Sequence, residues 1–316
     1  MSGQWNIGNR GRELALRKKQ LKQQISAYAM QQIRAHIRKH VLLKYREKQA
    51  ISSPHNAVKD TSYTYDSIKV AVITQSYYRK DGSSKKCLQN MFKMLEAQTY
   101  KKFKVFITGD NYQPESEFLE VCNEYKGEIY IHNNNHSCRD LNLGRIQNYW
   151  SYGGIHAAYN SYIKAKQEGF DIALMLDDDD HWYDSYVNSI VDNFIKYPKT
   201  AFMITKAEYG SQQYLPGTSI DSIYYNNYIP TGCDSVRSAS AHNINLIGDI
   251  VLNFWKGLIE EVDKMNLEDK KWGLSAADMQ LLNLIGAKVR SGEYKSLYIP
   301  TALVRKTSDC NWGNIK

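Results

Sequence analysis

Several features that would settle the class of this 316-residue protein are missing from its sequence. The five cysteines are scattered, odd in number and form no C-x-x-C pair, which argues against a disulfide framework or a zinc knuckle and favours reduced thiols. No run of about 18 apolar residues occurs, so we expect no membrane-spanning helix. The first ten residues lack the apolar core of a secretory signal, and we therefore expect a cytoplasmic protein.

The usual phosphate-binding loops are missing as well. Neither G-x-x-x-x-G-K-[ST] nor G-x-G-x-x-G occurs anywhere in the chain. What is present is an ordinary globular composition, with 42% apolar residues, and a length sufficient for one large domain or two smaller ones.

The net charge of +8 is concentrated at one end of the chain. Residues 1–50 hold 12 Lys/Arg against 2 Asp/Glu, a balance of +10, and the other 266 residues hold 29 against 31, a balance of −2. Within residues 11–49 an apolar residue recurs every fourth position, which predicts a basic amphipathic helical extension. Three uses fit it: packing on the body or on a second copy, peripheral contact with an anionic membrane, or gripping nucleic acid. Residues 51–66 are polar and read as a linker.

Residues 67–316 form the predicted main domain, in which strand and helix patterns alternate. Strands are expected at 69–78, 103–110, 128–133 and 171–176, with helices between them at 85–100, 115–125 and 153–169. This alternation predicts an α/β fold with a mostly parallel, doubly wound sheet flanked by helices. Ligands of such sheets bind beyond the carboxyl ends of the strands. Asp110 and the run Asp177–Asp180 both follow strands, so we expect them to share one cleft.

Four consecutive aspartates, Asp177–Asp180, follow the last of these strands and need partners, because unpaired carboxylates cannot be buried together. A calcium loop would require Gly and Glu where this run has Trp182 and Asn188. An aspartyl-phosphate phosphatase would have Thr or Val in the place of His181. A solvated acidic turn stays open as the structural alternative. The remaining chemistry is a Mg²⁺ or Mn²⁺ site for a diphosphate.

The aspartate run resembles the D-x-D signature of GT-A glycosyltransferases, most closely the large inverting family 2. The similarity covers about residues 68–305 and includes, in order, VAVITQSYYR, LEAQTYKKFKVFITGDN, GGIHAAYN and LMLDDDDHWY. The resemblance implies a GT-A (Rossmann-like) mixed, mostly parallel sheet, a nucleotide-diphosphate sugar as donor, most often a UDP-sugar, and Mn²⁺ or Mg²⁺. The chain departs from the family pattern at Gly109, at Asn111-Tyr112 and at Tyr159, where the family has Asp, Gly-Ser and Arg.

The resemblance also implies roles for individual residues. Tyr77 holds the place of the residue that packs on the nucleobase, and Asp110 that of the aspartate that binds the base. Asp177 and Asp179 hold the places of the D-x-D pair, with Asp180 beside the metal. We assign Asp179 and Asp180 to the metal and expect the following residues to contact the nucleotide sugar: Gln75, Tyr77, Asp110, Asp177, Asp178 and His242.

An inverting transfer also needs a carboxylate that accepts the proton of the acceptor hydroxyl. The family places an aspartate on a helix well downstream of D-x-D, and here the segment KWGLSAADMQLLNLIGAKV presents Asp278. Leu281, Leu282 and Ile285 form the expected buried face of the helix that Asp278 opens. An acidic residue at a helix N-terminus is also common for purely structural reasons, so that alternative stays open.

Together these features predict a metal-dependent inverting glycosyltransferase that moves a hexose or pentose to a hydroxyl of a glycan, a glycolipid or modified nucleic acid, with DNA among the candidate partners. Two alternatives remain. A nucleotidyltransferase on a related fold would carry a glycine-rich loop after the first strand, where this chain has QSYYRKDGSSKK. A catalytically dead GT-A-like binding protein would not need the aspartate run and Asp278 together.

Overall fold

The computed structural model describes residues 62–140, 152–209, 213–215, 225–226, 230, 237–264 and 277–306. The chain divides into the units Met1–Lys59 and Asp60–Lys316, and all described residues belong to the second. The helix predicted within residues 11–49 lies outside the described residues and stays a prediction. In the part that is described, no helix has the length and apolar character needed to cross a membrane.

The strands predicted for the first half of the main domain are confirmed. Strand β1 (Val70–Ser76) lies between β2 (Phe103–Gly109) and β4 (Ile172–Asp177), and β2 pairs with β3 (Glu128–Asn133). All three pairings are parallel. Strands β1, β2 and β4 are buried along nearly their whole length, as expected of parallel strands that are covered on both faces.

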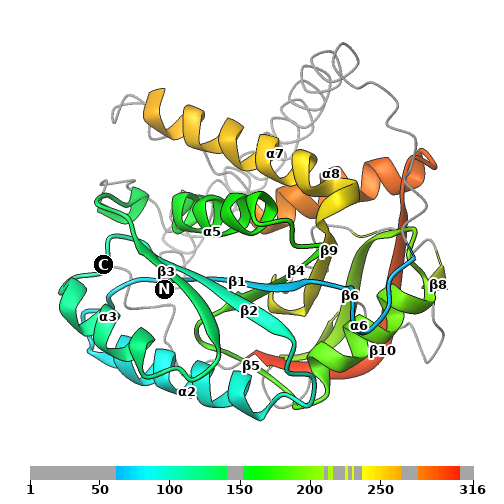
Figure 1. The fold of residues 1–316 in the computed structure, drawn as a ribbon. Helices are drawn as coiled ribbons and strands as arrows, with labels where there is room; N and C mark the ends of the chain where they lie inside the picture. Colours follow the sequence, from blue (N-terminus) through cyan, green and yellow to red (C-terminus); the bar gives the residue numbers. More distant parts are fainter. Residues whose placement is uncertain are drawn as a thin grey trace, which may run out of the picture. The chain divides into compact units, whose positions relative to one another are not determined.

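Helices cover both faces of this sheet. The predicted helices are α2 (Ser83–Ala97), α3 (Glu115–Asn123) and α5 (Ile155–Gln167). Three more follow later in the chain: α6 (Tyr186–Lys196), α7 (Ile244–Lys264) and α8 (Ala277–Arg290). Helices α5, α7 and α8 lie on one face of the sheet, and α2, α3 and α6 lie on the other (Figure 1).

The second half of the domain makes the sheet mixed. Strand β9 (Ser240–Asn243) runs antiparallel between β4 and β6 (Thr200–Tyr209), and β10 (Lys295–Lys306) runs parallel to β6. Strand β5 (Asp180–Trp182) closes the order β3-β2-β1-β4-β9-β6-β10-β5 by pairing antiparallel with β10. Two short strands, β7 (Gln213–Leu215) and β8 (Tyr225–Asn226), pair with β6 and β10. The expected mixed, mostly parallel α/β fold is confirmed.

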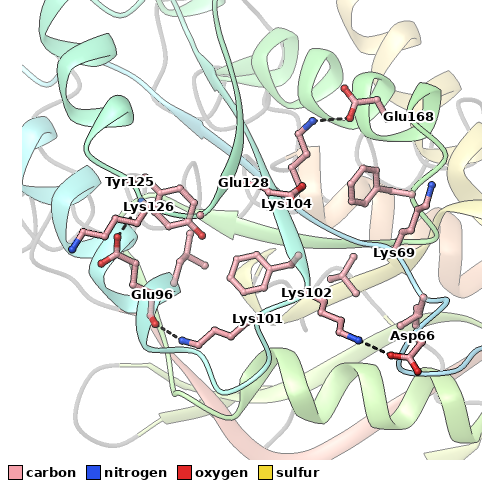
Figure 2. Close-up of a pocket in the computed structure, with 16 residues that line it drawn as sticks. Asp66, Lys69, Glu96, Lys101, Lys102, Lys104, Tyr125, Lys126, Glu128 and Glu168 are labelled. Atoms are coloured by element: carbon pink, nitrogen blue, oxygen red, sulfur yellow. Dashed lines mark hydrogen bonds and ion pairs between the residues drawn. The ribbon is translucent and has the colours of Figure 1, made fainter.

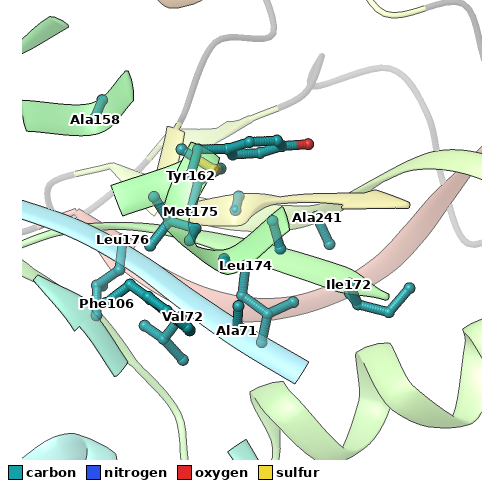
Figure 3. Packing of buried hydrophobic residues seen from close by; sticks show 14 of the residues in the cluster. Ala71, Val72, Phe106, Ala158, Tyr162, Ile172, Leu174, Met175, Leu176 and Ala241 are labelled. Carbon is teal, nitrogen blue, oxygen red and sulfur yellow. The ribbon is translucent and has the colours of Figure 1, made fainter. Parts of the chain in front are cut away.

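Apolar side chains from both faces of the sheet form the core. Figure 3 shows Val72, Leu174 and Met175 of the central strands packed together, with Tyr162 of α5 above them. All four side chains are at most 1% exposed. Burial of apolar area, at about 25 cal/mol per Å², is what holds the central strands in place. Their carboxyl ends are thereby fixed at one edge of the sheet. In parallel sheets of this kind, ligands bind in the crevice outside the carboxyl ends of the strands.

Candidate functional site

The four aspartates occupy the turn from β4 to β5, since β4 ends at Asp177 and β5 begins at Asp180. Asp178 turns inward and is 5% exposed. It accepts bonds from both terminal nitrogens of Arg79, at 3.0 and 2.6 Å, and from the Ser76 hydroxyl at 2.5 Å. Its charge is thus compensated inside the protein. This placement differs from the donor contact expected of Asp178, because both of its oxygens are already engaged.

Asp177 faces the crevice and is held from two sides. Its Oδ1 accepts a bond from Gln75 Nε2 at 3.1 Å and another from Arg237 Nη1 at 3.1 Å. Its backbone N–H donates to the hydroxyl of Ser238 at 2.9 Å. Gln75 therefore reaches the aspartate run from the neighbouring strand β1, and the short 3₁₀ segment Arg237–Ala239 supports the run from the other side.

Asp180 is buried beneath the run. Its Oδ2 accepts a 2.6 Å bond from the Ser238 hydroxyl and lies 3.6 Å from the ammonium of Lys306 on β10. Its Oδ1 is buried and has no hydrogen-bond partner among the residues that the structure describes. Burial raises the pKa of the Asp180 carboxyl to about 6, although Lys306 acts in the opposite direction.

Asp179 lies among the three other carboxylates of the run. Burial, followed by the carboxylates of Asp178, Asp177 and Asp180, raises its pKa to about 8, and the guanidinium of Arg79, 3.6 Å away, lowers it only in part. The turn thus brings together more negative charge than the surrounding cations offset. An added cation would favour the ionised form of both Asp179 and Asp180.

Whether these carboxylates fit a metal ion depends on the coordination required. In the part of the chain that the structure describes, no group of three or more His, Cys, Asp or Glu side chains is arranged to hold a metal by itself. Mg²⁺ in substrate complexes needs only one or two protein carboxylates, because diphosphate oxygens and waters complete the octahedron. Asp179 and the buried, unpartnered Oδ1 of Asp180 supply hard oxygen donors of that kind. The residues therefore fit a metal that binds together with a diphosphate.

Tyr77 follows β1 and lies under two guanidinium groups. The Cζ of Arg139 is 3.8 Å from the centroid of its ring, and that of Arg79 is 4.5 Å away. Both distances fall within the range of cation–π contacts. Because Arg79 also binds Asp178, the Tyr77 ring and the aspartate run are joined through a single side chain.

Asp110 lies at the carboxyl end of the neighbouring strand β2 and is 3% exposed. Its Oδ2 accepts bonds from Ser137 Oγ at 2.6 Å and from the Gly154 N–H at 3.1 Å, and it lies 3.3 Å from Nε of Arg139. Its Oδ1 is buried without a partner. Burial raises the pKa of Asp110, and Arg139 opposes that shift. Gly154 has a φ of 75°, and a Cβ there would lie 3.3 Å from Gln75 Cγ, which explains the glycine.

Asp278 occupies the first turn of α8, as predicted, and its Oδ1 accepts a 2.8 Å bond from the backbone N–H of Met279. Leu281, Leu282 and Ile285 form the buried face of the helix, also as predicted. Burial alone would lower the pKa of Lys306, but Asp180, Asp177, Asp179 and Asp278 raise it. Asp278 and three aspartates of the run are therefore within electrostatic range of one ammonium group.

The structure does not bring His242 to this cluster. His242 belongs to β9, is 2% exposed and packs against the rings of Tyr162 and Phe202, with centroid distances of 5.9 and 5.6 Å. Burial lowers its pKa to about 3, so the imidazole is neutral. The expected contact with donor or acceptor does not fit this position, because core side chains surround the ring.

Several residues of the site had no signal in the sequence. No role was predicted for Arg79, although it ends the motif VAVITQSYYR, nor for Arg139, Arg237, Ser238 and Lys306. The partner of Arg79 lies far along the chain, since 99 residues separate it from Asp178. The one available hint is chemical, because four adjacent carboxylates require cations nearby.

A hollow lies at the opposite, amino-terminal edge of the strands and has a volume of about 960 Å³. Figure 2 shows two ion pairs among its charged side chains, Lys102 with Asp66 at 2.6 Å and Lys104 with Glu168 at 2.8 Å. None of the residues predicted for the site lines it. We therefore place the candidate site at the aspartate edge, where carboxylates are in excess.

Comparison with known proteins gives a consistent result. No family model matches the chain. A stretch of 186 residues is 27% identical to the uncharacterized glycosyltransferase R139 of Acanthamoeba polyphaga mimivirus, covering 57% of this chain and 75% of the relative. The fold is similar to that of S. aureus TarS 1–349, with a TM-score of 0.50, 14% identity, and coverage of 76% of this chain and 61% of TarS 1–349.

The same TarS chain in complex with UDP matches with a TM-score of 0.50 and 13% identity, over 75% of this chain and 60% of that one. This chain therefore spans about three fifths of the solved chains that it matches. The comparisons confirm the expected fold, and they confirm the resemblance to glycosyltransferases.

Proposed function

We propose that this chain, which resembles glycosyltransferases in sequence and in fold, transfers a sugar from a nucleotide-diphosphate sugar to an acceptor hydroxyl with inversion. The observation that carries the proposal is the set of contacts at the carboxyl ends of β1, β2 and β4. There Arg79 and Arg139 connect the run Asp177–Asp180 with Tyr77 and Asp110, and Asp278 lies within electrostatic range of Lys306, which contacts Asp180. A solvated acidic turn would not explain the buried, unpartnered oxygens of Asp110 and Asp180.

The donor nucleotide binds on the side of Tyr77 and Asp110. The unpartnered Oδ1 of Asp110 is an acceptor for an N–H of the base, and Tyr77 offers an aromatic contact. We propose a UDP-sugar, since the structurally similar TarS chain forms a complex with UDP. The donor diphosphate then extends along the crevice toward Asp177 and Asp179.

Asp179 and Asp180 would hold a Mn²⁺ or Mg²⁺ ion together with the donor diphosphate. A bound divalent cation would neutralise charge on the leaving nucleoside diphosphate. The protein's own contribution is to fix these carboxylates: Ser238 bonds the Asp180 carboxylate and the Asp177 backbone, and Arg79 withdraws Asp178 into an internal ion pair.

Asp278 is the proposed general base. Its carboxylate takes the proton of the acceptor hydroxyl while the acceptor oxygen bonds to the anomeric carbon. The bond from that carbon to the phosphate oxygen breaks on the opposite face, and the nucleoside diphosphate leaves with the electron pair. Attack from the face opposite the leaving group inverts the anomeric configuration.

The acceptor is a hydroxyl of a glycan, a glycolipid or modified nucleic acid. We propose that the excess of 10 positive charges in residues 1–50 brings the chain to an anionic acceptor or surface. Deleting residues 1–50 should leave donor hydrolysis unchanged and weaken transfer to such an acceptor. Equal transfer by both forms at low and at high salt would contradict this role.

A nucleotide-release assay tests the proposed function. The purified protein is offered a panel of nucleotide sugars with Mn²⁺, with Mg²⁺ or with a chelator, and the released nucleotide is identified. We expect a nucleoside diphosphate from one donor, with release lost in the chelator. Release of pyrophosphate would identify a nucleotidyltransferase instead. No release and no nucleotide binding across the panel would indicate a binding protein.

A further inference from the structure

Lys306 is a buried lysine among carboxylates. It is directly opposite Asp180 in the antiparallel pairing of β10 with β5, its side chain is 14% exposed, and its ammonium lies 3.6 Å from Asp180 Oδ2. Lysine is rarely buried without a charged partner. We therefore expect Lys306 to compensate negative charge of the aspartate run.

Three protein cations contact the aspartate run, and Arg79 is shared between Asp178 and Asp179. Arg79 binds Asp178 through contacts of 3.0 and 2.6 Å, and Arg237 binds Asp177 at 3.1 Å. The contact of Lys306 with Asp180 is longer than these and exceeds the usual length of a charge-assisted hydrogen bond. Among these three cation contacts, that of Lys306 with Asp180 is the longest.

Lys306 also lies where an added cation would be attracted most strongly. The remaining oxygen of Asp180 is buried and has no hydrogen-bond partner among the described residues, and the carboxylate of Asp179 is next to it in the chain. An ammonium and a divalent ion cannot both lie against Asp180 without repelling each other. The flexible four-carbon stem of lysine allows the ammonium to move away when a stronger cation arrives.

We propose that Lys306 is the resident counter-cation of Asp180 and that a divalent ion must compete with it, so that Lys306 sets the metal affinity of the site. The inference rests on the proposed function, because it assumes that Asp179 and Asp180 hold the metal. It assigns to Lys306 a positioning role. Without metal, the ammonium compensates the charge of Asp180 and stabilises the turn that carries the aspartates. When metal binds, the ammonium moves away from Asp180.

The test compares Lys306→Gln, which keeps most of the side-chain length and removes the charge, with Lys306→Arg, which keeps the charge. Lys104→Gln is the matched control, because it removes a half-buried, ion-paired lysine at the opposite edge of the sheet. Mn²⁺ alone is titrated into each protein, and the free ion is measured by electron paramagnetic resonance. Melting temperatures are recorded without metal and with Mn²⁺.

We expect Lys306→Gln to bind Mn²⁺ about tenfold or more tightly than the wild type, because a neighbouring positive charge is removed. Lys306→Arg and Lys104→Gln should stay near the wild-type affinity. Without metal, Lys306→Gln should melt at a lower temperature, and Mn²⁺ should remove most of that difference. Binding by Lys306→Gln but not by the wild type would support the inference even more strongly.

Unchanged or weaker Mn²⁺ binding by a folded Lys306→Gln, in a series where the wild type binds, would overturn the inference and leave the proposed function standing. Absence of Mn²⁺ binding in every variant would overturn the metal site itself, and the inference with it. Asp179→Asn, which lacks a proposed ligand, shows in the same series how weak binding becomes when the site is damaged.

Discussion

The guanidinium of Arg79 joins Asp178 to Tyr77. It donates to Asp178 Oδ2 at 3.0 Å and to Oδ1 at 2.6 Å, and its Cζ lies 4.5 Å from the centroid of the Tyr77 ring. Burial lowers the pKa of Arg79, but Asp178 outweighs that effect and raises it, so the guanidinium is charged. One buried ion pair thus supports both the aspartate turn and the proposed base-binding tyrosine.

Breaking this pair should destabilise the domain strongly. Arg79→Met leaves the buried Asp178 carboxylate without its partner, a change that costs about 3–5 kcal/mol. The free energy of unfolding in urea measures the effect. In a double-mutant cycle, Arg79→Met with Asp178→Leu should cost clearly less than the sum of the two single changes. Additive costs, or a loss below about 1 kcal/mol for Arg79→Met, would contradict the structural role.

The buried Asp110 carboxylate should lower the stability of the folded protein at neutral pH, and it should also contribute to nucleotide binding. Its pKa is raised in the folded protein, mainly by burial, so the folded state holds the proton more tightly than the unfolded chain. Stability from this group is therefore present at low pH and is lost as the pH rises above about 4, toward the folded-state pKa. Asp110→Asn should reduce that loss, raise the melting temperature at pH 7–8 and weaken nucleotide binding.

Thermal melting at pH 5 and pH 8, with nucleotide titrations alongside, measures both effects. Asp249→Asn is the control, because it removes an exposed carboxylate that pairs with Lys166 on the surface. A melting temperature of Asp110→Asn below that of the wild type at pH 8, or unchanged nucleotide binding, would show that Asp110 is a structural residue.

Asp179→Asn should change the melting temperature in opposite directions without metal and with metal. Without metal it should raise the melting temperature, because it removes a carboxylate whose pKa is raised to about 8 by burial and by its three neighbours. With saturating Mn²⁺ and nucleotide the order should reverse, since ligand at about 100 times its Kd stabilises the wild type by about 2.7 kcal/mol. At about 2–4 °C per kcal/mol, differential scanning fluorimetry resolves both differences. A variant that is less stable under both conditions would be inconsistent with a metal ligand.

Ser238 should act through the aspartates that it positions. Its hydroxyl donates to Asp180 Oδ2 at 2.6 Å and accepts from the Asp177 N–H at 2.9 Å. Ser238→Ala should cost about 1–3 kcal/mol of stability and lower Mn²⁺ affinity about tenfold, as is typical when a partner of metal ligands is lost. Ser240→Ala is the matched control: its buried hydroxyl donates to the Arg237 carbonyl at 2.7 Å. Equal Mn²⁺ affinities in the two variants would rule out the positioning role.

The sequence predicted the parallel half of the sheet well for a physical reason. Strands β1, β2 and β4 are buried on both faces and therefore appear as unbroken apolar runs between helices with apolar faces. The antiparallel strands gave no such signal. Strand β9 has the sequence SAHN and β5 has DHW, and both are strands only because neighbouring strands bury them.

Some residues of the candidate site could likewise be predicted from the sequence, and others could not. Asp110, Asp178 and Asp278 could be found because each belongs to a local motif or lies at the end of an apolar element. How the carboxylates are shared among cations could not be predicted, because Arg79, Arg237 and Lys306 reach them through the tertiary fold. For that reason Asp178, expected to contact the donor, forms an internal ion pair. His242 lies in the core because its strand is inserted between β4 and β6.

We propose that Asp179, as metal ligand, and Asp278, as general base, act in one site to transfer the sugar. The most direct measurement is the rate of nucleoside-diphosphate release from the accepted donor by wild type, Asp179→Asn, Asp278→Asn and the surface control Asp249→Asn. We predict a loss of about 10²–10⁴-fold for Asp278→Asn with donor binding retained, a comparable loss with weakened metal binding for Asp179→Asn, and no change for the control. Release at the wild-type rate by Asp278→Asn or Asp179→Asn would place the chemistry elsewhere in the molecule.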